Sequence, residues 1–240
     1  MKKYLYLFLT MVPLLFSSCS DDDKLPAVTP TGHGTVTDDQ GNTYEWVRIG
    51  DLQWTTSNAK NGPYITDNTY FTNSQWVSLF TDDYGYVDYD AVDEYVESYV
   101  PEYGNLMNYA GAVASAPEGW RLPTDEDWQK LERVLGMHDT NKIGRRGNGQ
   151  AFRLQETDGG TELGMQLGGA FLYAPYGGVL DMPLNYQDVY GYYWTSTIDP
   201  ANQDEESAYF RKFLGGQGGI WRESGSTRQL MSVRWVKDAD

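Results

Sequence analysis

Hydrophobic and polar residues follow three successive patterns along the chain. Residues 4–16 are almost all apolar, and residues 20–33 are polar with scattered prolines. From there, short apolar and aromatic segments alternate with Gly, Asn and Asp. The first pattern is typical of an export signal, the second of a flexible tether and the third of a globular domain. The chain therefore predicts three parts: residues 1–18, residues 19–33 and a domain over residues 34–240.

Within the domain the pattern favours short strands. A turn over residues 38–42 leads into strand-like residues 44–49, and a second turn at Gly50 and Asp51 leads into a strand that begins at Leu52. These segments predict an antiparallel hairpin. Strand chemistry recurs in four later segments: residues 170–173, 192–197, 207–213 and 231–236.

The clearest helix follows Pro123. Thr124 is a suitable N-cap, and residues 125–127 are acidic, which the positive end of a helix dipole favours. Apolar residues then recur at helical spacing from Trp128 until Gly136 ends the pattern.

A second helix is predicted over residues 90–99. No repeat of fixed period is present in the sequence. Few helices together with many short strands predict one domain of the α+β class.

The amino terminus carries an export pattern. Two lysines precede the apolar run, and Ser17, Ser18 and Cys19 follow it, which is the order of a secretory signal. The run is too short to cross a bilayer, which takes about 20 apolar residues. A lone cysteine here resembles a bacterial lipobox, in which the thiol is lipidated at the new amino terminus, although Phe16 stands where such boxes usually carry Leu. Plain secretion with cleavage near Ser18 is the alternative.

The residues after Cys19 refine the expected location. Ser20 is followed by three aspartates, and this tract resembles the one that follows the lipidated cysteine in surface-exported lipoproteins of the Bacteroidetes. We therefore expect an outer-membrane lipid anchor on Cys19 and exposure at the cell surface. A solvated acidic spacer, with the protein facing the periplasm, is the alternative.

Net charge and composition restrict the classes of molecule that the protein is expected to bind. The chain has 18 Lys and Arg against 34 Asp and Glu, a net charge of −16, so nucleic acid is not an expected partner. The one local basic cluster, Lys142, Arg145 and Arg146 among glycines, is interpreted as a solvated loop. Aromatic residues make up 15% of the chain, which argues against disorder and for a packed core.

Five segments resemble one known family and occur in its order. They are TVTDDQGNTYEWVRIGDLQWTTSNAK at 35–60, YGNLMNY at 103–109, APEGWRLPTDEDWQKL at 116–131, GYYWTST at 191–197 and SVRWVK at 232–237. This ordered set resembles the Fibrobacter succinogenes major paralogous domain of exported Bacteroidetes and Fibrobacteres proteins. The resemblance implies a single C-type-lectin-like domain, with short antiparallel strands, one or two main helices and long loops that often form a binding face. It brings no established activity.

Two positions depart from that family. Many members resemble CPEGW and VRCV where this chain has Ala116 and Trp235, and the resemblance implies that these positions form the usual disulfide. Loss of a native bridge typically costs about 2–5 kcal/mol, and burial of a tryptophan side chain would offset part of it. We therefore predict that Trp235 is buried near Ala116.

Catalytic chemistry has few candidates. The only histidines are His33, in the predicted tether, and His138, just past the helix, so neither a His-rich zinc site nor a Ser-His-Asp triad is expected. The sulfatase-activating oxidases share the implied fold but need cysteines in the catalytic domain, and the mature chain has only Cys19. Paired carboxylates remain, which keeps a carboxylate-dependent glycoside hydrolase as a less favoured alternative. We expect no enzyme activity and no cofactor.

One stretch is crowded with acidic residues: Asp82, Asp83, Asp88, Asp90, Asp93 and Glu94. Calcium prefers several oxygen ligands from one loop, but the spacing does not fit an EF-hand. The sugar-binding signatures of calcium-dependent lectins are also absent from the sequence. We interpret the stretch as a solvated acidic face and assign no metal ligand, with a calcium site as the alternative.

Aromatic residues fall into two groups. Trp54, Trp120, Trp128 and Trp194 lie in the family-like segments, where core packing is the expected role. The second group lies among Gly, Pro, Asn and Asp, which leave no regular apolar face to bury it. We predict that this group binds ligand: Tyr173, Tyr176, Tyr186, Tyr190, Tyr192, Trp221 and the adjacent Arg222. Exposed rings beside polar groups suit sugar faces or a protein hot spot, and plain loop packing is the alternative.

Together these features predict a non-catalytic binding or adhesion module, held to the membrane only through the lipid on Cys19. Its expected partner is a glycan or a surface protein. A structural component of a surface assembly would instead self-associate through an edge strand, and a hydrolase would hold two facing carboxylates in a deep pocket.

Overall fold

The computed structural model describes residues 25–62, 86, 88–155, 160–172, 186–201 and 206–239, with the side chains of residues 89 and 91–96 excepted. Three predicted functional residues, Cys19, Tyr173 and Tyr176, lie outside this part of the chain. So does much of the acidic stretch, of which Asp88 and Asp90 are described and exposed. Within the described residues, no helix combines the length and the hydrophobicity needed to cross a membrane.

The first sheet is antiparallel and joins both ends of the described chain. It consists of β1 (His33–Thr37), β2 (Thr43–Ile49), β3 (Leu52–Thr55) and β8 (Val236–Asp238), in the order β1-β2-β3-β8. The predicted hairpin is confirmed as β2 and β3. The predicted strand over residues 231–236 begins later, because Met231 and Ser232 form only isolated bridges before β8.

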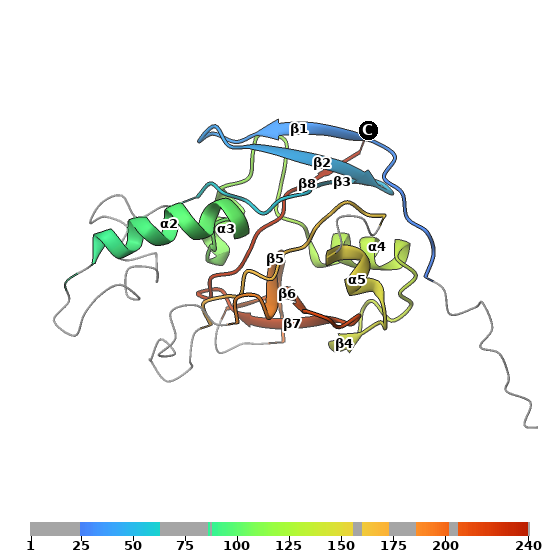
Figure 1. Cartoon of the computed structure of the whole chain (residues 1–240). Helices are drawn as coiled ribbons and strands as arrows, with labels where there is room; N and C mark the ends of the chain where they lie inside the picture. The colour runs from blue at the N-terminus through green and yellow to red at the C-terminus, as the bar shows by residue number, and fades with distance from the viewer. Residues whose placement is uncertain are drawn as a thin grey trace, which may run out of the picture.

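The second sheet is also antiparallel and contains the longest strand described. It consists of β4 (Gly144–Arg146), β5 (Tyr190–Ile198), β6 (Ser207–Leu214) and β7 (Ile220–Ser226), in the order β4-β7-β6-β5. Figure 1 shows this sheet at the bottom of the molecule and the first sheet at the top. The predicted segments at 192–197 and 207–213 therefore lie side by side as β5 and β6.

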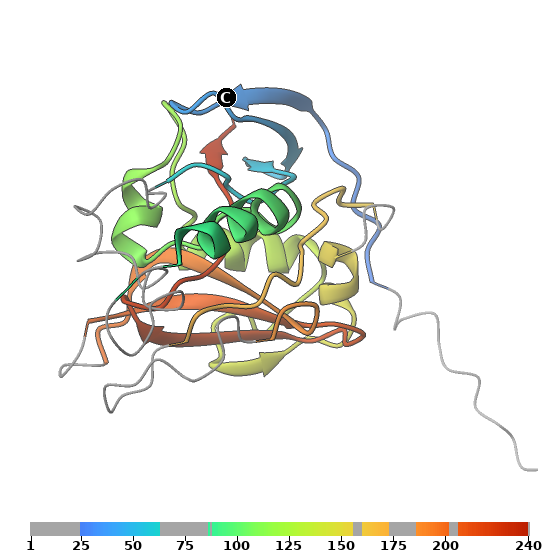
Figure 2. The ribbon, with the colours of Figure 1, turned by 60° about the vertical axis from the view of Figure 1, so that its left-hand side comes forward.

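Four short to medium helices are described: α2 (Tyr89–Tyr103), α3 (Tyr109–Ala114), α4 (Asp125–Val134) and α5 (Gln150–Gln155). The helix predicted after Pro123 is confirmed as α4. Its N-cap Thr124 accepts a hydrogen bond from the backbone N–H of Asp127 at 3.0 Å, and the Asp127 carboxylate accepts one from the Thr124 N–H at 2.8 Å. This reciprocal capping satisfies two backbone donors that the helix itself cannot pair. Figures 1 and 2 together show α2 at one side of the molecule, at a height between the two sheets.

Two clusters of buried hydrophobic residues form the core. The first joins Val47 and Trp54 of the first sheet to Trp128 of α4 and to Tyr193 and Phe213 on the inner face of the second sheet. The rings of Trp54 and Trp128 meet edge to face, with centroids 5.1 Å apart. Helix α4 therefore fills the space between the sheets, and the description of the fold as α+β is confirmed.

The second cluster packs on the opposite face of the second sheet, around Trp194 and Phe210. Trp235 belongs to it and is fully buried, as predicted, and Ala116 packs against the same cluster. The expected core roles of Trp54, Trp128 and Trp194 are also confirmed, whereas Trp120 is half-buried at the edge of this cluster.

The boundary of the folded domain lies earlier than Gly34. Val28 is only 7% exposed and belongs to the first core cluster, and the Thr31 N–H donates to the carbonyl of Arg48 at 2.9 Å. The predicted tether over residues 20–33 is therefore wrong for its later part. Val28 and Pro30 are buried here, but the segment has no apolar periodicity from which their burial could be predicted.

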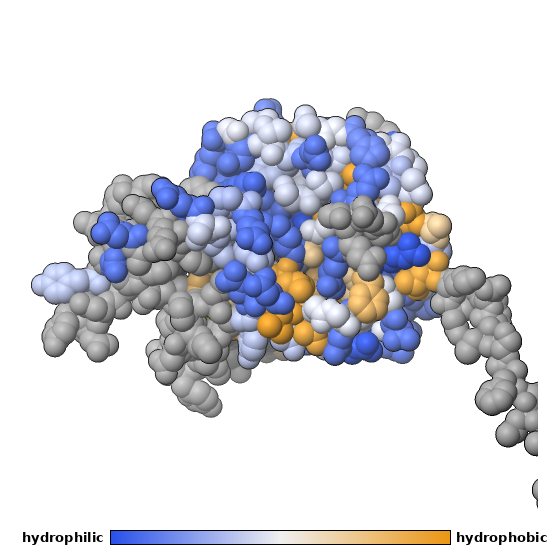
Figure 3. Space-filling model, viewed as in Figure 1, coloured by the Kyte–Doolittle hydropathy of each residue, from blue (hydrophilic) through white to orange (hydrophobic). Residues whose placement is uncertain are grey.

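Polarity differs between the sheets in the view of Figure 3. Hydrophilic side chains cover the first sheet, whereas hydrophobic side chains show lower down, over β5 and α5. The lower half of the molecule therefore presents the more apolar surface on this side.

Candidate functional site

Strand alternation divides the side chains of the second sheet between its two faces. Lys212 on β6 lies opposite Tyr192 on β5 and opposite Trp221 on β7, and Trp221 in turn lies opposite Arg145 on β4. Directly opposite residues project to the same face, so these side chains form one row across four strands. This row lies on the face turned away from α4.

Lys212 is the centre of this row. Its Nζ atom lies 5.8 Å from the ring centroid of Tyr190 and 5.4 Å from that of Trp221. The same Nζ donates to both carboxylate oxygens of Glu223 at 2.9 Å. A cation held between aromatic rings and a carboxylate is stabilised by about 0.5–2 kcal/mol per ring, which restricts all of these side chains. We call Tyr186, Tyr190, Lys212, Trp221 and Glu223 the aromatic face.

Tyr186 extends the aromatic face into the turn before β5. Its side chain is 52% exposed, and its ring meets that of Tyr190 edge to face with centroids 5.3 Å apart. The Tyr186 carbonyl accepts a hydrogen bond from the Tyr190 N–H at 2.9 Å, which fixes the turn to the strand. Tyr190 and Trp221 are half-buried, so the rings are anchored yet accessible.

Two residues predicted to bind ligand, Tyr192 and Arg222, are buried, and of these only Tyr192 lies on the same side of the sheet as the aromatic face. Tyr192 is only 5% exposed and packs in the second core cluster against Phe210. Arg222 is 8% exposed and points to the other side of the sheet, because it follows Trp221 directly in a strand. The sequence-based expectation that Tyr192 and Arg222 are exposed is therefore wrong.

Arg222 instead joins a buried ionic network behind the aromatic face. Its Nη2 lies 2.8 Å from Asp125 of α4, and Arg211 of β6 reaches Asp125 at 2.7 Å and Glu132 at 2.6 Å. Arg146 of β4 completes the network with a contact of 2.8 Å to Glu132. The interpretation of residues 142–146 as a solvated loop is thus wrong for Arg146, which is 4% exposed and pairs with a helix distant in sequence.

The network depends on charge pairing. Burial raises the pKa of the Asp125 carboxyl, but hydrogen bonds and charges from Arg222 and Arg211 outweigh it and bring the pKa to about 2. Asp125 is therefore ionised at neutral pH and holds β6 and β7 in register against α4. This support keeps the strands that carry Lys212 and Trp221 fixed in the aromatic face.

The sequence analysis missed Lys212 and Glu223. Glu223 lies two positions after Trp221 in β7, and Lys212 lies on β6, directly opposite Tyr192 and Trp221. The alternating pattern of β6 and β7 is the signal that could have found them.

Potential metal ligands do not gather at one place in the described residues. Across that part of the chain, no group of three or more His, Cys, Asp and Glu side chains is placed to hold a metal ion. His138 is exposed, and exposed His33 lies 2.9 Å from Glu162.

The comparison with protein families decides what kind of domain this is. The model of the Fibrobacter succinogenes major domain matches residues 47–237. The chain belongs to this family. The Fibrobacter succinogenes major domain thus extends from the middle of β2 to β8 and includes the aromatic face and the ionic network. β1 and the packed segment around Val28 precede the matched part of the domain. Neither the curated proteins nor the solved structures include a significant match to the chain.

Proposed function

We propose that this protein is a cell-surface lipoprotein whose domain binds a glycan through the aromatic face, without catalysis. The observation that carries the proposal is the placement of Tyr190 and Trp221 on either side of Lys212, whose charge is paired by Glu223. Accessible rings offer flat apolar surfaces to sugar faces, and the paired charges offer a donor and acceptors to sugar hydroxyls.

The scaffold and the export pattern support the same proposal. Two antiparallel sheets with a helix between them agree with a C-type-lectin-like fold, in which one region is given over to binding. Lipidation of Cys19 and display on the outer face of an outer membrane would place the aromatic face where extracellular glycans occur. A surface protein is the other ligand that such an aromatic cluster suits.

A glycan array tests the proposal. The chain from residue 25 to residue 240 is screened with and without calcium, since the acidic stretch leaves calcium dependence open. We expect a related set of glycans to bind. Binding to none of the glycans under either condition would contradict glycan recognition, and concentration-dependent self-association would then indicate a surface assembly.

Substitutions locate the binding surface. Tyr190→Ala and Trp221→Ala should each weaken binding of the best glycan by about tenfold or more, because each removes a ring that contacts the ligand. Calorimetric titration measures the loss, and a thermal melt confirms that the variants fold. Phe152→Ala removes an exposed ring from α5, outside the aromatic face, and should leave binding unchanged. Retained binding in Tyr190→Ala and Trp221→Ala would exclude the aromatic face.

A further inference from the structure

Apart from the aromatic face, two adjoining hollows lie beneath the first sheet. A hollow of about 620 Å³ is bounded by β2, by the end of α2 and by the segment at residues 162–167. An adjoining hollow of about 530 Å³ runs under β1 and shares Glu45, Thr56 and Glu162 with the first. The two therefore form one elongated site, which we call the acidic groove.

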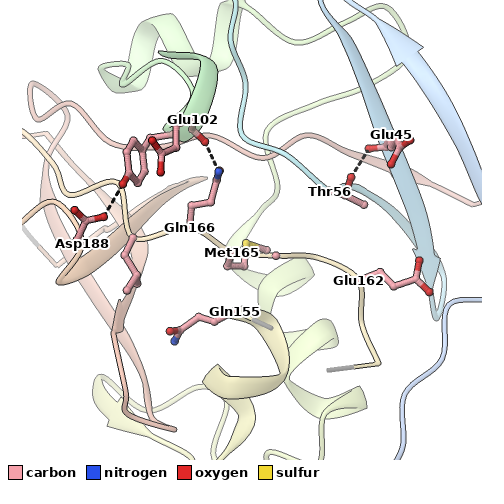
Figure 4. A pocket seen from close by; sticks show the side chains of 11 residues that line it. Glu45, Thr56, Glu102, Gln155, Glu162, Met165, Gln166 and Asp188 are labelled. Carbon is pink, nitrogen blue, oxygen red and sulfur yellow. Dashed lines mark hydrogen bonds between the residues drawn. The ribbon is translucent and has the colours of Figure 1, made fainter. Parts of the chain in front are cut away.

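Four carboxylates line the acidic groove and no Lys or Arg side chain does so in the part of the chain described. Figure 4 shows Glu45 and Glu162 on one side of the larger hollow and Glu102 and Asp188 on the other. The only histidine at the site is His33, which pairs with Glu162. Buried Arg234 lies behind the wall, where it donates to the carbonyls of Leu163 and Gly164. The groove thus has two acidic ends.

The part between the acidic ends is apolar and carries amides. Met165 lies there, and Leu167 lines the hollow beside Asp188; the aliphatic stems of Lys and Arg pack well on such apolar side chains. Gln166 donates from Nε2 to the carbonyl of Glu102, which leaves its Oε1 as the acceptor. That Oε1 and the Nε2 of Gln155 are both buried and have no hydrogen-bond partner among the described residues.

A buried amide atom without a hydrogen-bond partner lowers the stability of the protein. A ligand that paired with Gln166 Oε1 or Gln155 Nε2 would therefore be favoured, and neither atom would give up an existing hydrogen bond. One free acceptor and one free donor match the N–H and C=O of a peptide group. Small amines lack this pair of groups. The amides therefore distinguish a peptide from other cationic ligands.

Backbone geometry at the site is also unusual. Glu162 and Asp188 have φ angles of 58° and 61°, in the left-handed region that side-chain-bearing residues rarely adopt. Among the described residues, Tyr186 is the only other non-glycine with positive φ. Such conformations persist at binding sites, where the orientation of a side chain matters more than local stability.

Asp188 is held in place by a neighbour at the same acidic end. The Tyr103 hydroxyl donates to Asp188 Oδ1 at 2.6 Å, and this hydrogen bond and burial raise the pKa of Tyr103 to about 12. Tyr103 is therefore neutral at physiological pH and keeps donating its proton to the carboxylate. One acidic end is thereby fixed before any ligand arrives.

We propose that the acidic groove binds an extended peptide segment with two cationic side chains, Lys or Arg, one at each acidic end. The groove is longer than a site for a single ammonium group, so its two acidic ends call for two cationic groups on one ligand. Complementary charge attracts the segment, the apolar middle takes up the side-chain stems, and the amides pair with its backbone.

The test uses capped peptides with two lysines separated by alanine spacers of increasing length. Calorimetric titration with the chain from residue 25 to residue 240 should show binding that peaks at one spacer length and weakens as salt is raised. The same peptides with glutamine in place of lysine should not bind. Equal affinity for all spacer lengths, or equal affinity for spermidine, would overturn the assignment to a peptide of defined spacing.

A charge-matched pair of variants separates the groove from the acidity of the whole protein. Glu45→Gln with Glu162→Gln should reduce affinity about tenfold or more, because both carboxylates of one acidic end are lost. Asp39→Asn with Glu118→Gln removes the same charge from exposed turns outside the groove and should change affinity less than about twofold. Equal losses in the two pairs, or no binding of any peptide to the native protein, would overturn the proposal.

Discussion

Asp125 connects one helix to two strands through a single carboxylate. It is 5% exposed and lies within 2.8 Å of both Arg211 and Arg222. The sequence predicted only that an acid at this position favours the start of a helix. Its larger role depends on β6 and β7, which lie more than 80 residues away in sequence.

Replacement of Asp125 should destabilise the protein strongly. Asp125→Asn leaves two buried guanidinium groups without their shared charge partner, so the free energy of unfolding should fall by about 3–5 kcal/mol. Urea denaturation measures the change. Glu126→Gln is the matched control, because Glu126 is exposed at the next position and its ion pair with Arg133 is at the surface, so a change below about 1 kcal/mol is expected.

The same network predicts how stability depends on acidity. The pKa of Asp125 is about 2 in the folded protein and near 3.8 in an unfolded chain, so its contribution is complete above about pH 4 and is lost as pH falls towards 2. This loss should be smaller in Asp125→Asn than in the native protein. An identical acid profile for the two proteins would contradict this role.

At the scale of elements, the sequence predicted correctly those helices and strands whose determining residues all lie within the element itself. The hairpin at residues 44–55 and helix α4 were predicted because turn residues, caps and periodicity all lie within them. Strand β4 was missed, because Gly144–Arg146 is short, rich in turn signals and stabilised only by pairing with β7. Local propensity carries no information about such a partner.

The cap of α4 gives a prediction at this scale. Thr124→Ala removes the side-chain acceptor for the Asp127 N–H and should lower the free energy of unfolding by about 1 kcal/mol. Thr124→Ser keeps the hydroxyl and should restore most of it. Equal stability of the Ala and Ser variants in urea denaturation would show that the hydroxyl of residue 124 does not act as a cap.

At the scale of the whole molecule, the domain depends on residues that precede the family match. Burial of one valine contributes about 1.5–3 kcal/mol, and Val28 lies in the core cluster that joins the two sheets. A chain that begins at residue 34 should therefore melt about 5 °C below one that begins at residue 25. Differential scanning calorimetry measures both midpoints, and equal midpoints would show that residues 25–33 add no stability.

The aromatic face and the acidic groove differ in how many of their residues could be predicted from the sequence. Tyr190 and Trp221 were predicted because rings among turn residues stand out in a sequence, although nothing local showed that they lie beside Lys212. The acidic groove was not foreseen. Its carboxylates come from β2, from the end of α2 and from two separate turns, and an acidic chain offers too many such residues to choose among.

By itself, the sequence determined the α+β class, the burial of Trp54, Trp128, Trp194 and Trp235, and membership of a family. These properties follow from composition, periodicity and the order of local segments. All three can be read without knowing which residues are in contact. Tertiary structure decided that Arg222 and Arg146 are buried, that Val28 belongs to the core and that four distant carboxylates share one groove. The physical reason is that burial and charge pairing depend on which strands and helices meet, and these contacts join residues far apart in the chain.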